Sequence, residues 1–248
     1  MGELTSDQKT SSYQWVNIED IEKLPGRQGI YLCQTLALLW KGMPNNRVDE
    51  IREKIGEVSL PDFLYKVRDS QEVIFYGGSF NPWHEGHESC VKQAPSENII
   101  IVPDYNPWKA KRNSFFGPTC RWASLRELAL KFKDRGFSFY PGFWGIETPN
   151  PTSRWMPEVK YTRKSLIIGD DNFMSFDKWK NTKYLIGELE RIYVIPRLHA
   201  LTDIERKKRE FESLFSTDVF QVMEPHEYQH VSSTTIRSAI KREFAFPL

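Results

Sequence analysis

Short apolar runs recur along the chain from about residue 72 onward, each rich in Ile, Val, Phe or Tyr. Runs of this length and composition are typical of buried strands. We predict six strands, at Val73–Tyr76, Asn98–Val102, Phe137–Tyr140, Ser165–Ile168, Arg191–Ile195 and Val219–Met223. Between these strands, apolar residues recur at helical spacing, most clearly in Thr119–Asp134, where Thr119 is placed to cap the helix. This alternation predicts an α/β fold, a Rossmann-like doubly wound parallel sheet that binds ligands at the carboxyl ends of its strands.

Residues 1–70 have a different pattern. A polar tail is followed by helical periodicity at Ile18–Lys23, Ile30–Trp40 and Val48–Ile55, with turn residues between these stretches. Side chains typical of catalysis do not gather there. We therefore predict a helical N-terminal extension over residues 1–70, added to a main domain over residues 71–248. The extension could cover a sheet edge, form a subunit contact or regulate access to a site.

The composition narrows the classes of partner. Apolar residues make up 40% of the 248 residues, charged residues 27%, and the net charge is +1. A chain with this balance has no overall positive electrostatic field that would attract nucleic acid. Its apolar runs are far shorter than the roughly 18 residues of a membrane span. Cys33, Cys90 and Cys120 show no metal-binding spacing. We expect a reduced, cytoplasmic protein without nucleic-acid, membrane or protein-held metal sites, which could form a homo-oligomer.

One glycine-rich segment combines features of a phosphate-binding site. The strand at Val73–Tyr76 runs into Gly77 and Gly78, a turn follows, and a helix is predicted to begin near His84. Glycines let a ligand approach the backbone closely, and a helix N-terminus favours anions. His84 and His87 are three residues apart, so both imidazoles project to one side and can donate hydrogen bonds to phosphoryl oxygens. The alternative is a glycine-rich turn in which His84 only caps the helix and His87 is solvated.

A second pattern of this kind lies near the end of the sequence, at residues 230–237. Ser232 or Ser233 is placed to cap a helix there. The free N–H groups of that helix, the Ser and Thr hydroxyls and Arg237 can then converge on phosphate oxygens. On its own, the same pattern also describes an ordinary helix cap.

Together, these segments resemble the signature of the nucleotidylyltransferase superfamily. The first reads Gly77-Gly78-Ser79-Phe80-Asn81-Pro82-x-His84-x-Gly86-His87, most similar to bacterial nicotinate-nucleotide adenylyltransferases, and the second reads Ser232-Ser233-Thr234-x-x-Arg237. Two further matches lie between them. Lys109 takes the basic position of a family loop that ends Pro-His-Lys or Pro-His-Arg, although Trp108 replaces the histidine. Gly169-Asp170-Asp171 resembles the family's Gly-x-Asp and is followed by Trp179.

The resemblance implies a role for each matched residue. Catalysis would use His84, His87, Lys109 and Arg237, acting on the phosphates of ATP. ATP binding would use Gly77, Gly78, Ser79, Phe80, Asn81, Ser232, Ser233 and Thr234. A mononucleotide would be held by Asp171 and by Trp179, whose indole would stack on the pyridine ring, and Mg²⁺ would be bound mainly through the ATP phosphates. The implied reaction joins ATP to nicotinate mononucleotide, a step of NAD biosynthesis that releases pyrophosphate and forms nicotinate adenine dinucleotide.

Several alternatives stay open. The acceptor could be nicotinamide mononucleotide, which carries an amide in place of the carboxylate. A superfamily member that acts on pantetheine phosphate, or a cytidylyltransferase, is disfavoured by the doubled glycine, Asp171 and Trp179. A nucleotide-binding protein without turnover is disfavoured by the full set of basic residues. The match weakens between residues 147 and 163, where the family forms part of its nicotinate pocket.

Overall fold

The computed structural model describes residues 72–103 except 97, residues 125–140 except 126, 133 and 135, residues 151–159, and residues 161–243. The extension predicted over residues 1–70, the Thr119 cap, and Lys109 with its neighbour Trp108 lie outside the described residues. Within the described part, no helix is long and apolar enough to cross a membrane.

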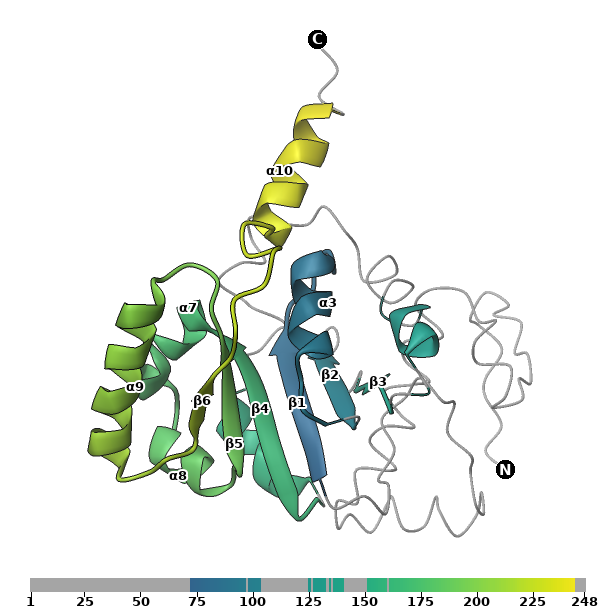
Figure 1. Ribbon diagram of the computed structural model, residues 1–248. Helices are drawn as coiled ribbons and strands as arrows, with labels where there is room; N and C mark the ends of the chain where they lie inside the picture. Colours follow the sequence, from purple (N-terminus) through teal and green to yellow (C-terminus); the bar gives the residue numbers. More distant parts are fainter. Residues whose placement is uncertain are drawn as a thin grey trace, which may run out of the picture.

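Six strands form one sheet in the described part of the chain (Figure 1). They are β1 Glu72–Gly78, β2 Ile99–Pro103, β3 Ser138–Phe139, β4 Arg163–Gly169, β5 Arg191–Ile195 and β6 Phe220–Val222. Their order is β3-β2-β1-β4-β5-β6, and every neighbouring pair is parallel. The six predicted strands and the doubly wound parallel sheet are therefore confirmed, with strand ends that differ by about two residues at most.

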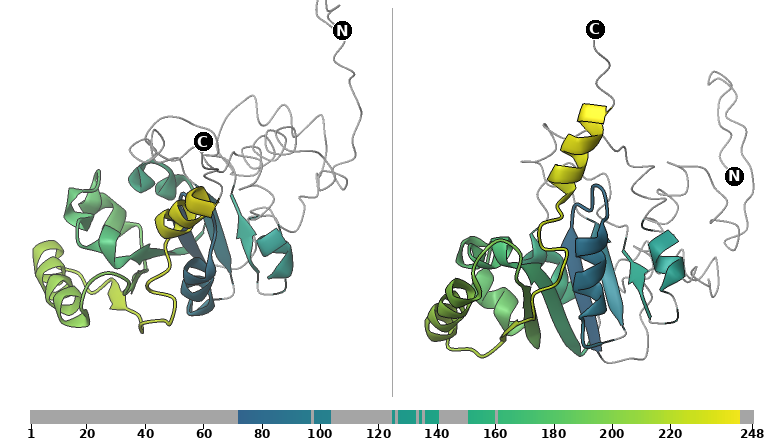
Figure 2. Two further views of the ribbon diagram at one scale, coloured as in Figure 1. Left: turned by 90° about the horizontal axis from the view of Figure 1, so that it is seen from above. Right: turned by 45° about the horizontal axis from the view of Figure 1, so that its top comes forward.

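Apolar side chains alternate along β1, and helices cover both faces of the sheet (Figure 2). Ile74 and Tyr76 pack with α3 Glu85–Lys92 and with the helical residues 127–131 of the predicted Thr119–Asp134 helix. Val73 and Phe75 pack on the opposite face with α6 Thr152–Trp155, α7 Asp170–Phe173, α8 Thr182–Gly187 and α9 Leu201–Phe215. The remaining helices of the described part are η4 Met156–Glu158, η5 Phe176–Lys178 and α10 Ser233–Glu243.

The order of the strands reverses between β1 and β4. β1 lies beside β2 on one side and beside β4 on the other. The carboxyl ends of these two strands carry Gly77-Gly78 and Gly169, and Gly169 lies beside Ile195 at the end of β5. Open α/β sheets bind ligands at this position. Helix α10 stands above β1 and α3 in Figure 1, which brings the second phosphate-binding pattern to this edge.

Candidate functional site

The two segments predicted to bind phosphate touch each other in the fold. The hydroxyl of Ser233 donates a hydrogen bond to the carbonyl oxygen of Pro82 at 2.9 Å. The guanidinium of Arg237, itself buried, donates to the carbonyl oxygen of Asn81 and to Thr234 Oγ1, the latter at 3.0 Å. The start of α10 is thereby fixed on the turn that follows β1.

Ser232 is the residue that caps α10. Its Oγ accepts a hydrogen bond from the N–H of Thr235 at 3.1 Å and lies 2.8 Å from Thr235 Oγ1. This is the usual geometry of a Ser cap, which satisfies one of the free N–H groups of a first helical turn. Because Ser233 is engaged with Pro82, the prediction of a Ser cap is confirmed for Ser232. The helix therefore begins beside the glycine turn, where its N-terminus favours an anion.

The turn after β1 is held by the side chain of Phe80 and leaves the backbone of Gly77 open. Phe80 adopts a φ of 42°, which is uncommon for a residue with a side chain. Its ring is buried and lies 5.1–5.3 Å, between ring centroids, from the rings of Tyr76, Trp83 and His87. A Cβ added at Gly77 would meet nothing within 4 Å. A ligand therefore has room to approach the backbone there.

His84 and His87 lie together, as their spacing predicts. Their rings stack with centroids 3.7 Å apart and planes 27° apart, and only 5% and 9% of their surfaces are exposed. His84 is the residue before the first turn of α3, but its side chain makes no capping hydrogen bond. The alternative interpretation, with a capping His84 and a solvated His87, therefore does not describe this geometry.

The imidazole of His84 is neutral at pH 7. Burial, followed by the positive charge of Arg197, lowers the pKa of His84 from 6.5 to about 4. Among the described residues neither ring nitrogen of His84 has a hydrogen-bond partner, although both are buried. Leaving buried polar atoms unpaired costs about 1–3 kcal/mol each, so a ligand that supplies partners would bind favourably.

Gly86 allows the first turn of α3 to lie close to the backbone at Tyr228, just before the second motif. A Cβ at Gly86 would lie 3.0 Å from two atoms of the His84 ring and 3.2 Å from the backbone carbonyl oxygen of Tyr228. A side chain between the two histidines would therefore crowd the His84 ring and the backbone at Tyr228.

The two carboxylates after β4 have different surroundings. Asp170 is fully buried, and its Oδ2 accepts the backbone N–H groups of Leu198 and His199, both at 2.7 Å. Burial alone would raise the pKa of Asp170, but hydrogen bonds, mainly from the backbone N–H groups of His199, Arg197 and Leu198, outweigh it and lower the pKa. Asp171 is exposed in the first turn of α7. Asp170 thus supports the loop after β5, and Asp171 remains open to a ligand.

Trp179 lies at the end of η5, on the face of the sheet that α7 and α8 cover. Its ring packs against Phe176, with centroids 5.0 Å apart and planes 49° apart, and it is half-buried. One part of the indole is held by the core and another part is exposed. That arrangement is compatible with a stacking role.

The sequence prediction did not include Arg197, which lies two residues beyond the end of β5. Its charge acts on His84, His226 and Cys90. The sequence signal for Arg197 is a basic residue two positions after the strand predicted at Arg191–Ile195. Cys90 is free, burial raises its pKa, and its thiol donates to the carbonyl oxygen of Gly86 at 3.0 Å, so it is not an activated nucleophile.

The polar groups of the described residues at the carboxyl edge suit an anion. The described residues contain no group of three or more His, Cys, Asp and Glu side chains that could hold a metal. The imidazoles, the helix N-terminus and the guanidinium groups at this edge present hydrogen-bond donors and positive charge instead. Phosphate oxygens are natural partners for such a set.

Known proteins match the same part of the chain. Residues 75–239 match the family model described as Cytidylyltransferase-like. A protein of Leptospira interrogans named "Probable nicotinate-nucleotide adenylyltransferase" is 30% identical over 139 residues, which cover 49% of this chain and 65% of that protein. A protein of the same name from Sulfurovum is 30% identical over 176 residues, which cover 67% of this chain and 83% of that protein.

Among solved structures, the fold is similar to that of Plasmodium falciparum nicotinic acid mononucleotide adenylyltransferase complexed with NaAD. The two chains are 16% identical with a TM-score of 0.47, and the match covers 68% of this chain and 83% of the other. The chain spans just under two thirds of the length of the Leptospira relative.

Proposed function

Because the chain belongs to the cytidylyltransferase-like family, we propose that it is an adenylyltransferase that joins ATP to nicotinate mononucleotide, giving nicotinate adenine dinucleotide and pyrophosphate. The observation that carries this proposal is the contact between the two phosphate-binding segments, with Ser233 on Pro82 and Arg237 on Asn81. The relatives from Leptospira and Sulfurovum, which carry the name of this activity, support the choice of substrates.

The chemistry needs positioning and charge stabilisation more than proton transfer. The phosphate of the mononucleotide is ionised at pH 7 and attacks the α-phosphorus of ATP in line. A bond forms between its oxygen and the α-phosphorus, the bond from that phosphorus to the bridging oxygen breaks, and pyrophosphate leaves. Since the nucleophile is already an anion, no general base is required. No covalent intermediate is needed, which agrees with the unreactive environment of Cys90.

The stacked histidines would stabilise the charge that develops on the reacting phosphates. A neutral His84 donates one N–H and can accept with its other nitrogen, and His87 lies in ring contact with it. Fixed donors that meet developing charge are typically the largest contribution to catalysis of this kind. Arg237 would add positive charge while holding the turn through Asn81, and Lys109, outside the described residues, would neutralise the leaving pyrophosphate.

The ATP side of the site is formed by the glycine turn and the start of α10. Gly77, where an added Cβ would meet nothing within 4 Å, would let the phosphates approach the backbone, whereas a Cβ at Gly78 would lie 3.0 Å from the Phe80 ring. The N–H groups beyond Ser232 would face the phosphates. Mg²⁺ would enter as part of the substrate, as magnesium–ATP, and be held mainly by phosphate oxygens and water. The donor set at this edge fits the phosphates that carry the ion.

The acceptor side would use Asp171 and Trp179. Asp171 is exposed just after β4. The indole of Trp179 packs against Phe176 and is partly exposed. Replacing Trp179 with Ala is expected to raise the KM for the mononucleotide, since stacking of a base-like ring contributes roughly 1–3 kcal/mol, and to leave the KM for ATP nearly unchanged. Steady-state kinetics on the folded variant measures both constants; a fully buried structural role for Trp179 would instead show as unfolding at room temperature.

A substrate panel tests the proposed function. Pyrophosphate release is measured with ATP, GTP or CTP as donor and with nicotinate mononucleotide, nicotinamide mononucleotide or pantetheine phosphate as acceptor. The proposal expects ATP with nicotinate mononucleotide to give the highest kcat/KM, at least about tenfold above every other pair, equivalent to about 1.4 kcal/mol. A preference for CTP, or for pantetheine phosphate, would assign a different reaction. ATP binding without pyrophosphate release from any pair would indicate a nucleotide-binding protein.

A further inference from the structure

Residues 223–232 connect β6 to α10 and so carry the second phosphate-binding pattern to the carboxyl edge (Figure 1). This connection is in contact with two other parts of the fold. The side-chain amide of Gln229 donates to the carbonyl oxygen of Pro196, just after β5, at 2.9 Å. The carbonyl oxygen of Tyr228 lies 3.2 Å from a Cβ built on Gly86, in the first turn of α3. The position of the helix start therefore depends on how the connection is held.

The imidazole of His226 organises the turn inside this connection. Its Nδ1 accepts the backbone N–H of Tyr228 at 3.2 Å. A side-chain acceptor that binds the N–H two residues further on has the same effect as the side chain of an Asx-turn. The carbonyl oxygen of Tyr228 in turn accepts the N–H of Val231 at 3.0 Å, and Val231 directly precedes the Ser232 cap. Two hydrogen bonds therefore lead from His226 to the start of α10.

The other side of the same ring faces α3. His226 Nε2 lies 4.0 Å from Cys90 Sγ, and the thiol of Cys90 donates to the carbonyl oxygen of Gly86 at 3.0 Å. Because a backbone N–H can only donate, Nδ1 carries no proton, and the neutral ring has its proton on Nε2, on the side of the sulfur. His226 thus bridges the connection and α3, the helix that contains His87.

The charged and titratable groups around His226 come from three parts of the fold. Cys90 and His84 face it from α3, Arg197 from the residues after β5, and Glu227 from its own segment. Burial, followed by the charge of Arg197, lowers the pKa of His226, and Glu227 opposes this effect. The ring is therefore neutral at pH 7, and protonation at lower pH would place a proton on Nδ1, which could then no longer accept a backbone N–H.

We propose that His226 is a positioning residue for ATP binding, which fixes the turn at Tyr228 against α3 and thereby holds the helix start at Ser232 where the nucleotide phosphates would bind. It acts through the backbone and touches no substrate itself. Ser233 on Pro82 and Arg237 on Asn81 fix the helix start on the glycine turn. His226 adds the contact with α3. The proposal rests on the proposed function for the identity of the nucleotide.

Two substitutions at His226 and one matched control test this role by titration calorimetry with magnesium–ATP. His226→Phe keeps a ring but removes the acceptor, and we expect the Kd to rise about 3- to 10-fold, the range for one neutral hydrogen bond. His226→Asn should bind within about twofold of wild type, because its Oδ1 can accept the same N–H. In the control, Thr217→Val, the lost Oγ1 accepts the N–H of Val219 at 3.3 Å just before β6, at the opposite edge of the sheet. Its Kd should equal that of wild type.

A pH series gives the second measurement. Wild type and His226→Asn are titrated from about pH 7.5 to about pH 5, on both sides of an ordinary histidine pKa. The ratio of the wild-type Kd to the Asn Kd should rise as the pH falls, because only wild type loses its acceptor. Protonation of ATP itself affects both proteins alike and cancels in the ratio.

Several outcomes would overturn the proposal. They are a wild-type Kd in folded His226→Phe, an equal loss of binding in Thr217→Val, and a Kd ratio that stays constant or falls with decreasing pH. If His226→Phe does not fold, the pH series with His226→Asn carries the test. Because binding is measured without turnover, a wild type that binds ATP but transfers nothing refutes only the proposed function.

Discussion

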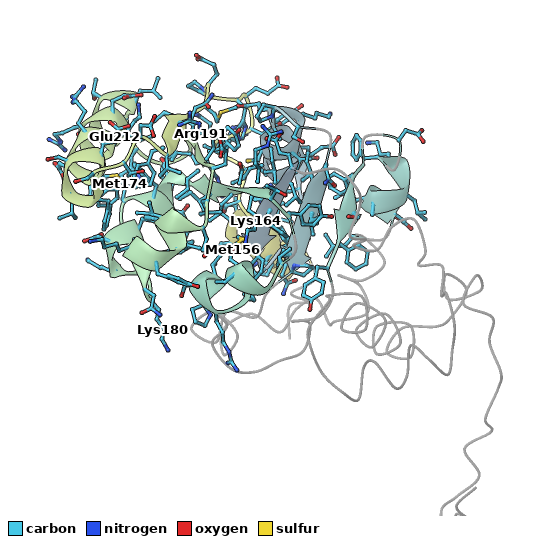
Figure 3. All side chains as sticks on the ribbon, turned by 90° about the horizontal axis from the view of Figure 1, so that it is seen from below. Met156, Lys164, Met174, Lys180, Arg191 and Glu212 are labelled. Carbon is cyan, nitrogen blue, oxygen red and sulfur yellow. The ribbon has the colours of Figure 1, made fainter. Side chains whose placement is uncertain are left out.

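Two buried polar side chains at the amino edge of the sheet, those of Lys164 and Asn98, have hydrogen-bond partners, whereas several buried polar atoms at the carboxyl edge have none among the described residues. At the amino edge, the ammonium group of Lys164 donates to the carbonyl oxygen of Met156 and to the carboxylate of Glu188, at 3.2 and 3.1 Å (Figure 3). Asn98 in the same region donates to the carbonyl oxygen of Glu72 at 2.7 Å. At the carboxyl edge, both ring nitrogens of His84 and the Oδ1 of Asn81 are buried without a partner among the described residues.

This difference separates stabilising polar groups from functional ones. An internal hydrogen bond to a charged group contributes about 1.5–3 kcal/mol, and an unsatisfied buried group costs about 1–3 kcal/mol. The amino edge therefore adds to stability. The carboxyl edge carries a cost that a bound phosphate can offset, as is common where residues are held ready for a ligand. Substitutions at the two edges should consequently have opposite effects on stability and on turnover.

The largest effect is expected at the carboxyl edge, from His84→Ala and His87→Ala. Removal of one donor that stabilises transition-state charge typically lowers kcat about 10²- to 10³-fold. The Kd for ATP should change only several-fold, because the glycine turn and the start of α10 remain. Measurement of kcat, ATP Kd and melting temperature on each variant checks this. A lower melting temperature with normal kcat in the folded fraction would show a purely structural role, and rescue by excess divalent ion would show a metal-ligand role.

The matching test at the amino edge is Lys164→Met. It leaves the carbonyl oxygen of Met156 and part of the Glu188 carboxylate without their donor, while the methylene groups of the side chain are kept. We expect the free energy of unfolding to fall by about 1–3 kcal/mol, with kcat and KM within twofold of wild type. Urea unfolding and steady-state kinetics measure the two. A large loss of kcat with unchanged stability would remove the distinction between the edges.

Substitutions of two glycines are expected to have smaller effects, and at both positions the added methyl group has room. A Cβ meets nothing within 4 Å at Gly77 or at Gly187, the last residue of α8. Gly77→Ala should fold normally, but its methyl group would obstruct the close approach of phosphate to the backbone, so the KM for ATP should rise about tenfold, or about 1.4 kcal/mol. Gly187→Ala should leave the KM unchanged and stabilise the fold by up to about 1 kcal/mol. Equal KM values in the two variants would argue against phosphate binding at Gly77.

The smallest expected effect is a pH dependence of stability that arises from His84. In the unfolded chain His84 takes up a proton near its ordinary pKa of 6.5, but in the fold its pKa is about 4. Between these values the unfolded state binds more protons, so the free energy of unfolding decreases as the pH falls from about 6.5 to about 4. His84→Gln should flatten this decrease in urea titrations. His226, whose burial also lowers its pKa, accounts for a remaining slope of the same sign. Identical slopes for wild type and His84→Gln would contradict a neutral, buried His84.

Much of the sheet could be predicted from the sequence because buried parallel strands are continuous apolar runs. Strands such as Ile99–Pro103 and Arg191–Ile195 are almost entirely buried, and their composition alone marks them. The pairing of His84 with His87 could also be predicted from their separation of three residues, although His84 itself precedes α3 with an extended backbone. These features are decided within one segment of the chain.

Other features of the site depend on contacts between distant segments. The left-handed backbone of Phe80 is held by rings from β1 and α3. The role of Asp170 depends on the loop after β5 lying beside the end of β4, and the place of Arg197 depends on that same register. Sequence spacing contains no direct signal for such neighbours. The family pattern directed attention to Asp171 and treated Asp170 as variable, although Asp170 is the carboxylate that the fold buries.

The proposed reaction is the transfer of an adenylyl group between two nucleotides at the carboxyl edge of the sheet. Its most direct test follows wild-type protein, magnesium–ATP and nicotinate mononucleotide by ³¹P NMR. We expect equimolar appearance of inorganic pyrophosphate and of the diphosphate resonance of a dinucleotide, and no reaction when the mononucleotide is omitted. Formation of ADP with inorganic phosphate, or persistence of both substrates under conditions where ATP is bound, would contradict it.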